Sequence, residues 1–159
     1  MREIKFRGKD LNGVWRHGSL VNNVFFYADT KKGVPYIFDV EDVDYYCLAD
    51  LEDGEGFYEM RPDTIGQFTG LHDKNGKEIY EGDIIKIVED DEPFYTEVKF
   101  YKGVFGVENW TENTRNRCLT TLNHFMPTIG LYDEEQEYTI EVVGNVYDNK
   151  ELLDTFKKK

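Results

Sequence analysis

Hydrophobic and polar residues alternate along much of the N-terminal third of the chain, with the period of a half-buried strand. The alternation is clearest where Ile4 and Phe6 stand between charged residues. Asn12-Gly13 is a turn signal, and Pro35 suits the first residues of a strand or an edge strand. The pattern predicts strands in this part of the chain at residues 3–7, 14–17, 20–28 and 34–40.

The same kind of pattern returns after residue 64, with turn residues between apolar runs. Asn75-Gly76 is a strong hairpin signal because both residues tolerate positive φ. Lys102-Gly103 is expected to form a tight hairpin turn, and Glu81-Gly82-Asp83 a turn that starts a strand. The predicted strands here lie at residues 65–68, 79–80, 83–88, 96–101, 104–108 and 138–146.

Two segments have helical character. Between residues 111 and 126 the apolar residues fall at steps of three and four, which predicts a short helix that Pro127 ends. Near the C-terminus, Asp148 to Glu151 has the form of a capping box. Leu152, Leu153 and Phe156 are then expected to lie on a short terminal helix.

Short strands, tight hairpins and one or two short helices indicate a mainly β fold. We expect a small N-terminal β module at residues 1–60 and an SH3-like β-barrel module at residues 61–159. The less regular segment 39–59 is interpreted as a solvated acidic connection. A faint internal repeat is also present, which two hairpins of one plan or chance similarity of turn residues would explain. Phe6-x-Gly8, Asn12-Gly13, Trp15 and Gly18 recur in order as Phe68-x-Gly70, Asn75-Gly76, Tyr80 and Gly82.

The net charge of -13 is unevenly distributed. Residues 1–38 carry seven basic and three acidic side chains, a balance of +4, whereas residues 39–59 carry nine acidic side chains and no Lys or Arg. A protein this acidic is repelled from phosphate backbones and anionic membranes unless a basic face is segregated. The first 38 residues are the only place for such a face.

The residue types that carry catalysis are sparse. Ser19 is the single serine and has no Gly-x-Ser-x-Gly motif around it. Cys47 and Cys118 are far apart, which favours reduced, buried thiols, and the three histidines lack the paired spacing of a zinc site. We therefore expect no catalytic residues, no cofactor and no metal. The nearest polar candidates for an undetected enzyme, each explained more simply by turn formation, are His72, Glu81 and Asp83.

The block from Gln67 to Val88 and both ends of the chain resemble the YopX family of phage and prophage proteins. The similarity is carried by residues 66–71, 73–77 and 79–84, with support from residues 2–9 and 141–149. It implies a mainly β protein with a barrel-like C-terminal module and no established biochemical activity. It implies no catalytic or binding residue. The positions of the family motif with a structural role are Gly70, Asn75, Gly76, Tyr80, Gly82 and Asp83.

The leading functional hypothesis is a non-enzymatic, phage-encoded module that binds a host or phage protein, or a second copy of itself. The basic N-terminal part and the acidic segment 39–59 would attract one another between subunits, which predicts salt-sensitive self-association. The candidate interaction residues are Arg2, Lys5, Arg7, Lys9, Trp15 and Arg16.

Two alternatives stay open. The same basic residues would contact phosphates in a nucleic-acid-binding protein, with Trp15 or Phe25 stacking on bases, although the net charge opposes this. Segment 39–59 would instead imitate phosphates if the protein inhibits a host DNA-binding enzyme. No apolar run approaches the roughly 18 residues of a membrane span, and the first residues lack the apolar core of a signal peptide. We expect no membrane partner and a location in the host cytoplasm.

Overall fold

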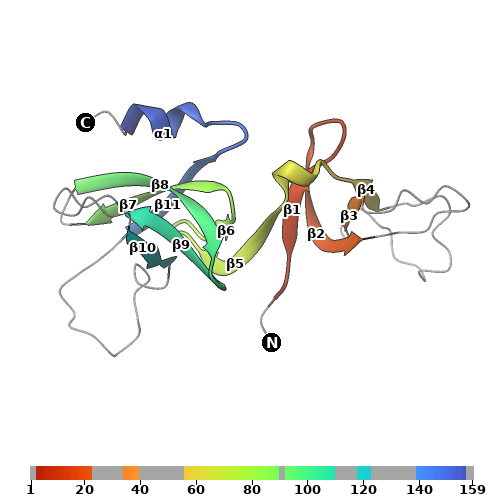
Figure 1. Ribbon diagram of the computed structural model, residues 1–159, viewed down its shortest axis with the longest axis horizontal. Helices are drawn as coiled ribbons and strands as arrows, with labels where there is room; N and C mark the ends of the chain where they lie inside the picture. Colours follow the sequence, from red (N-terminus) through yellow and green to blue (C-terminus); the bar gives the residue numbers. More distant parts are fainter. Residues whose placement is uncertain are drawn as a thin grey trace, which may run out of the picture. The chain divides into compact units, whose positions relative to one another are not determined.

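The computed structural model describes residues 3–22, 34–39, 56–89, 92–109, 118–122 and 139–156, and within them the protein is mainly β (Figure 1). The chain forms two compact units, residues 1–68 and residues 69–159, here called unit 1 and unit 2. Gly66 and Gln67 pair with β1 (Phe6–Lys9), the first strand of unit 1.

Unit 1 contains strands β1 to β4 and the start of β5, in an antiparallel sheet with the order β4-β3-β2-β1-β5-β6; the rest of β5 and all of β6 belong to unit 2. A 3-10 helix, Pro62–Thr64, precedes β5. The strands are β1 (Phe6–Lys9), β2 (Trp15–Asn22), β3 (Pro35–Phe38), β4 (Phe57–Glu59), β5 (Gly66–His72) and β6 (Glu78–Tyr80).

Close packing in unit 1 depends on two glycines. Gly8 of β1 lies against the side chain of Met60, whose terminal carbon would be 2.9 Å from an added Cβ. Gly18 of β2 has a φ of 150°, and a Cβ there would overlap the carbonyl oxygen of Phe38 on β3. The sequence suggested a break at Gly18, whereas β2 runs through it without interruption. Ile37 and Met60 are buried.

Unit 2 contains a five-stranded antiparallel sheet with the order β10-β9-β8-β7-β11 (Figure 1). The register of β11 on β7 shifts between Val142 and Gly144, which marks a β-bulge. The strands are β7 (Asp83–Glu89), β8 (Glu92–Tyr101), β9 (Val104–Asn109), β10 (Cys118–Thr121) and β11 (Thr139–Asn145).

The core of unit 2 comes from the alternating apolar positions of these strands. On β7, Ile85 and Ile87 are buried, while Lys86 between them is half-buried. They pack in one cluster whose other buried members are Ile79, Val98, Val107, Leu122, Ile140 and Val142. The hairpin turn predicted at Lys102-Gly103 is confirmed, with φ values of 50° and 87° that suit a type I′ turn.

The prediction of a helix at residues 111–126 is wrong where the structure describes that range. Cys118 to Thr121 form β10, which pairs with β9, and Leu122 enters the core. Spacing by three and four does not separate a short helix from a short strand followed by a core residue. The β-branched Thr120 and Thr121 favour the strand, and the edge of β9 supplies its partner. Residues 111–117 and 123–126 lie outside the described residues.

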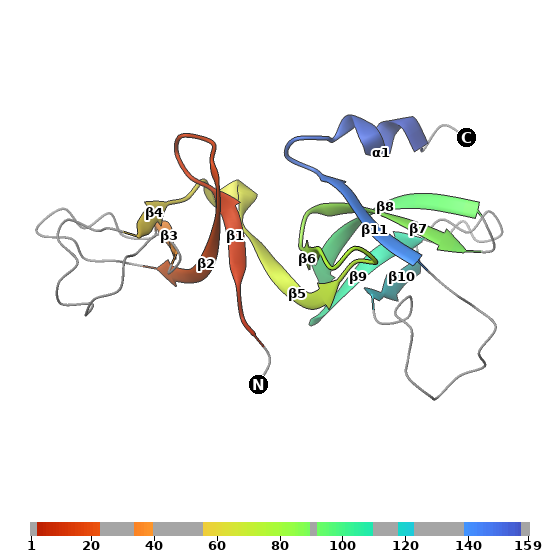
Figure 2. The ribbon, with the colours of Figure 1, turned by 180° about the vertical axis from the view of Figure 1, so that it is seen from behind.

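The predicted C-terminal helix is confirmed as α1 (Glu151–Phe156), which lies beside β8 (Figure 2). Leu152 and Leu153 are half-buried. Strand β4 was not predicted, because its three residues stand in a segment interpreted as an acidic connection. Neither sheet is closed within the described part of the chain, so the SH3-like barrel stays a prediction.

Candidate functional site

The predicted interaction residues of unit 1 gather where β1 pairs with β2. The register places Lys9 opposite Trp15 and Arg7 opposite His17, and residues directly opposite one another share a face of the sheet. The guanidinium of Arg7 lies 5.0 Å from the centroid of the Trp15 ring, and Nζ of Lys9 lies 5.3 Å from it. Two cations therefore contact one aromatic ring.

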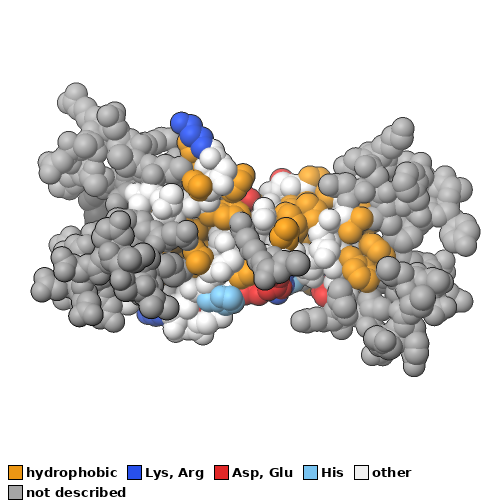
Figure 3. Space-filling model, turned by 90° about the horizontal axis from the view of Figure 1, so that it is seen from below, with side chains coloured by type: hydrophobic (Ala, Val, Ile, Leu, Met, Phe, Trp, Pro, Cys, Tyr) orange, Lys and Arg blue, Asp and Glu red, His pale blue; other side chains and the backbone are white. Residues whose placement is uncertain are grey.

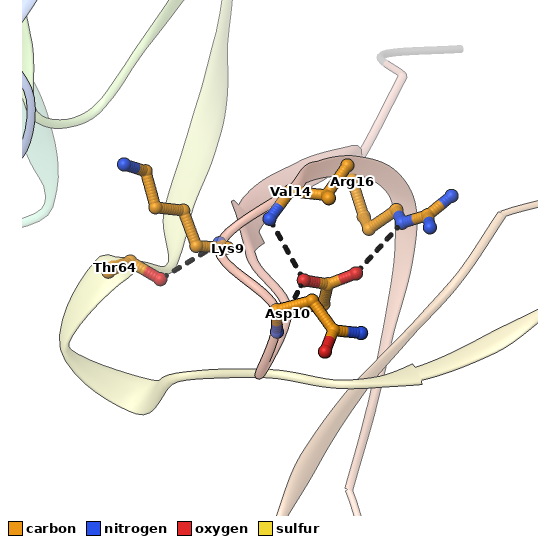
Figure 4. A network of polar contacts seen from close by, with 6 residues as sticks. Lys9, Asp10, Val14, Arg16 and Thr64 are labelled. Carbon is orange, nitrogen blue, oxygen red and sulfur yellow. Dashed lines mark hydrogen bonds and ion pairs between the residues drawn. The ribbon is translucent and has the colours of Figure 1, made fainter.

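Arg16 stands on the other face of the sheet, where its charge is used within the fold. Its guanidinium lies 3.7 Å from the centroid of the Tyr58 ring on β4. Its Nε donates to Oδ2 of Asp10 at 3.3 Å (Figure 4). Arg7 is itself buried. Arg2 and Phe25 lie outside the described residues, and Lys5 is half-buried.

Asp10 organises the β1–β2 turn. Its Oδ1 accepts hydrogen bonds from the backbone N–H groups of Asn12 and Val14, both at 2.9 Å (Figure 4). Burial by itself would raise the pKa of the Asp10 carboxyl, but the hydrogen bonds from Val14, Arg16 and Asn12 hold that pKa below its ordinary value. The carboxylate is therefore charged in the folded protein at neutral pH.

The β5–β6 turn in unit 2 is built in the same way around Asp73. Its Oδ1 accepts from the N–H groups of Asn75 at 2.8 Å and Lys77 at 2.9 Å, and its Oδ2 accepts from the N–H of Val142 at 3.0 Å. Burial would raise the pKa of this carboxyl too, but the three backbone donors and the charge of Lys77 lower it. Asp73 thus joins its turn to β11.

The residues of the family motif occupy turn and core positions. Gly70, Gly76 and Gly82 have positive φ values of 85°, 81° and 81°. Asn75 supplies a backbone donor to Asp73, as described above. The Tyr80 N–H donates to Oδ2 of buried Asp83 at 2.8 Å, and the Tyr80 hydroxyl donates to Oε2 of Glu78 at 2.6 Å.

The polar candidates for an enzyme have different environments. Asp83 is buried and holds the β6–β7 turn through Tyr80, whereas His72 is exposed near the end of β5 and Glu81 is half-buried in the turn. Within the described ranges there is no group of three or more His, Cys, Asp or Glu side chains that could hold a metal ion. None of the helices in the part that the structure describes has the length and apolar character to cross a membrane.

Exposed large apolar side chains concentrate at the β1–β2 hairpin and the β8–β9 hairpin. Figure 3 shows hydrophobic side chains on the surface of the described residues. On the β8–β9 hairpin, Phe100 and Tyr101 are each 50% exposed and Val104 is 43% exposed. These three residues are here called the hairpin tip. The Phe100 ring packs on Phe105 with centroids 5.0 Å apart, while Tyr101 pairs with Val104 across the turn.

Sequence reasoning missed both Asp10 and the hairpin tip. The available signal for Asp10 was the repeat of Asp-x-Asn-Gly at residues 10–13 and 73–76, of which only the Asn-Gly part was recognised. For the tip, the signal was an apolar residue on each side of Lys102-Gly103. The alternating pattern predicts that these residues belong to strands, but it does not predict that their side chains are exposed.

A family model described as YopX protein matches residues 22–154. Among solved structures, the chain is similar to the crystal structure of protein EF1440 from Enterococcus faecalis, with 20% sequence identity and a TM-score of 0.45. That match covers 96% of this chain and 99% of the other. No curated protein matches the chain.

Proposed function

The chain belongs to the YopX family, and from this premise we propose that it is a non-enzymatic, phage- or prophage-encoded module that binds another protein in the host cytoplasm. The observation that carries the proposal is the hairpin tip, where two aromatic side chains and a valine are exposed at the end of a regular hairpin. Aromatic residues are enriched in protein–protein interfaces because they bury a large area with few rotatable bonds.

The chemistry of the tip favours a protein partner. Nζ of Lys102 lies 5.2 Å from the centroid of the Tyr101 ring, so one cation stands beside the apolar residues. An apolar centre with a charged margin is the usual composition of an interface. An SH3-like closure of unit 2, a common frame for binding modules, is part of the proposal by fold analogy alone.

The test is a comparison of tagged proteins in pull-downs from phage-infected host lysate, with and without nuclease, measured by quantitative mass spectrometry. The test variant is Tyr101→Ser with Val104→Ser, which leaves the packing of Phe100 on Phe105 in place. The control is Asp63→Ser with Lys150→Ser, two exposed positions outside the β8–β9 hairpin. We expect nuclease-resistant partners to be recovered with the wild type and the control and to be lost with the test variant.

An identical partner set for the wild type and the tip variant would count against the tip as the interface. Recovery of nucleic acid, or of partners that disappear on nuclease treatment, would favour the nucleic-acid alternative through Lys5, Lys9 and Trp15. The inhibitor alternative concerns segment 39–59, most of which lies outside the described residues. It predicts that added protein reduces restriction or nuclease activity in host extract.

A further inference from the structure

The chain contains two Asn-Gly pairs, and both are exposed. Asn12-Gly13 lies in the turn at residues 10–14, here called the Asp10 turn, and Asn75-Gly76 lies in the turn at residues 73–77, here called the Asp73 turn. Among asparagine sites, Asn-Gly is the most reactive in deamidation, because glycine has no Cβ to obstruct attack of its backbone nitrogen on the preceding side-chain amide. The local conformation therefore decides whether either pair reacts.

Both turns hold the reacting nitrogen in the same way. The Gly13 N–H donates to the Asp10 carbonyl oxygen and the Gly76 N–H to the Asp73 carbonyl oxygen, both at 2.9 Å. Gly13 and Gly76 have φ values of 83° and 81°, as in a type I turn followed by a left-handed glycine. In such a turn the glycine nitrogen faces the carbonyl to which it is bonded rather than the asparagine side chain. Deamidation of either pair therefore requires the turn to open and this hydrogen bond to break.

The Asp73 turn is also tied to a neighbouring strand through the residue before Asn75. The Lys74 N–H donates to the carbonyl oxygen of Ile140 on β11 at 2.9 Å, and Nζ of Lys74 lies 2.7 Å from Oε2 of Glu141. Because Lys74 and Asn75 are adjacent, a backbone rotation that opens the turn disturbs both contacts. Opening of the Asp73 turn therefore breaks bonds to β11 in addition to the bonds within the turn.

The Asp10 turn is held at its base. Asp10 pairs with Met60 in an isolated β-bridge, and its Oδ2 accepts from Nε of Arg16. Leu11, at the position that corresponds to Lys74, is 63% exposed, and none of the described residues accepts a hydrogen bond from its N–H. Among the described residues, opening around Asn12 thus breaks bonds of the turn alone. Openings that break few contacts are the most populated in a folded protein.

From this difference we propose that Asn12 is a site of spontaneous deamidation in the folded protein and that Asn75 is protected. The backbone nitrogen of Gly13 loses its proton and bonds to Cγ of Asn12, the bond from Cγ to the amide nitrogen breaks, and that nitrogen leaves with the proton as ammonia. The product is a five-membered succinimide ring. Water then adds to one of the two ring carbonyl carbons, the bond from that carbon to the Gly13 nitrogen breaks, and the nitrogen regains a proton. Attack at Cγ leaves aspartate, and attack at the backbone carbonyl carbon leaves isoaspartate.

The products change the hairpin that carries the candidate interaction residues. Either product adds a carboxylate close to that of Asp10, whose Oδ1 accepts from the Asn12 N–H, and like charges repel. Isoaspartate also lengthens the main chain by a methylene within the turn that joins the paired strands of Lys9 and Trp15. We therefore expect deamidation to destabilise the β1–β2 hairpin. The inference is independent of the proposed function, which concerns the hairpin tip in unit 2.

The test follows both pairs in the same molecule, so that each asparagine is the internal control for the other. The full chain is incubated in mildly alkaline buffer, digested at intervals and analysed by tandem mass spectrometry, with isoaspartate detected by enzymatic methylation. We expect Asn12 to be converted about five- to fiftyfold faster than Asn75, a ratio set by the hydrogen bond and the ion pair that only the Asp73 turn must break. In concentrated urea, where neither turn persists, the two rates should become similar because the reacting dipeptide is the same.

A matched pair of substitutions tests the contacts to β11. Lys74→Ala removes the ion pair with Glu141, and Leu11→Ala is the corresponding change in the Asp10 turn. We expect Lys74→Ala to raise the rate at Asn75 about two- to fivefold and Leu11→Ala to leave the rate at Asn12 unchanged. Equal rates at the two asparagines in the folded chain would overturn the inference, as would no conversion of Asn12 over the time in which the urea-unfolded chain is converted. A rate ratio that persists in urea would also overturn it, because the difference would then come from neighbours in the sequence and not from the turns.

Discussion

At the scale of the residue, three aspartates of the described chain hold turns by accepting backbone hydrogen bonds. Asp10 and Asp73 each receive two N–H groups of their own turn, and Asp83 receives the N–H of Tyr80. Short polar side chains compete well for nearby backbone donors, which is why aspartate is common at such positions. In this chain, part of the large acidic content therefore stabilises the fold.

Asp73 should be the most sensitive of these residues, because it is buried and accepts three backbone hydrogen bonds. We expect Asp73→Asn to lower the free energy of unfolding by about 2–4 kcal/mol, since an amide group would face the Val142 N–H and the charge is lost. Urea unfolding measures the change. Asp63→Asn, at an exposed position, should stay within about 0.5 kcal/mol of the wild type. Equal effects of the two substitutions would contradict the role given to Asp73.

The same carboxylate predicts a pH dependence. The folded pKa of Asp73 is lowered, so its stabilisation is present above the unfolded pKa of about 3.9 and is lost as the pH falls through the folded value. The difference in unfolding free energy between wild type and Asp73→Asn should be constant above about pH 5 and shrink below about pH 4. Urea unfolding of both proteins across this range measures it. A difference that grows toward low pH would have the wrong sign.

At the scale of the element, close approach of the backbone decides which glycines matter. Gly18 and Gly13 both have positive φ. A Cβ at Gly18 would meet the backbone of Phe38, whereas none of the described residues lies within 4 Å of a Cβ at Gly13. We expect Gly13→Ala to cost about 1–2 kcal/mol for the left-handed conformation alone. Gly18→Ala should cost clearly more, because β2 and β3 must move apart. Urea unfolding of the two variants orders them, and a Gly13→Ala effect as large as that of Gly18→Ala would contradict the packing explanation.

The elements differ in how far the sequence predicted them. Hairpins at Asn75-Gly76 and Lys102-Gly103 were recognisable, because the turn conformation depends on the turn residues themselves. Strand β10 was not, because Cys118 to Thr121 become a strand by pairing with the edge of β9. Strand β9 lies too far away in the sequence for a local pattern at residues 118–121 to indicate this pairing.

At the scale of the whole molecule, charge separation predicts salt-sensitive self-association. Residues 1–38 carry +4 and residues 39–59 carry -9. Arg7 is buried and Arg16 is paired with Asp10, so Lys5 and Lys9 are the residues to change. We expect light scattering after size exclusion to show an oligomer at low salt that dissociates by about 0.5 M NaCl, where screening is strong. Lys5→Gln with Lys9→Gln should weaken it, with Lys99→Gln and Lys150→Gln as the control pair. A monomer at every salt concentration would refute this prediction.

The candidate sites were only partly accessible from the sequence. The hairpin whose turn was predicted brings Arg7, Lys9 and Trp15 together, whereas their role in binding a partner stays a prediction. The sequence did not indicate that Arg16 would turn to Tyr58, because β4 is far along the chain. The exposure of the hairpin tip was not predicted either. Alternation of apolar and polar residues distinguishes the two faces of a strand, but it does not show which face another element of the fold covers.

The sequence by itself determined that this protein is mainly β, where its tight turns lie, and that it belongs to the YopX family. These properties depend on local backbone preferences and on residue patterns that can be read without a partner. Only the tertiary structure decided that Cys118 to Thr121 form a strand, that Asp73 binds the edge of β11 and that Leu11 and the hairpin tip are exposed. Each of these depends on contacts between segments distant in the chain, whose free energy outweighs local propensity.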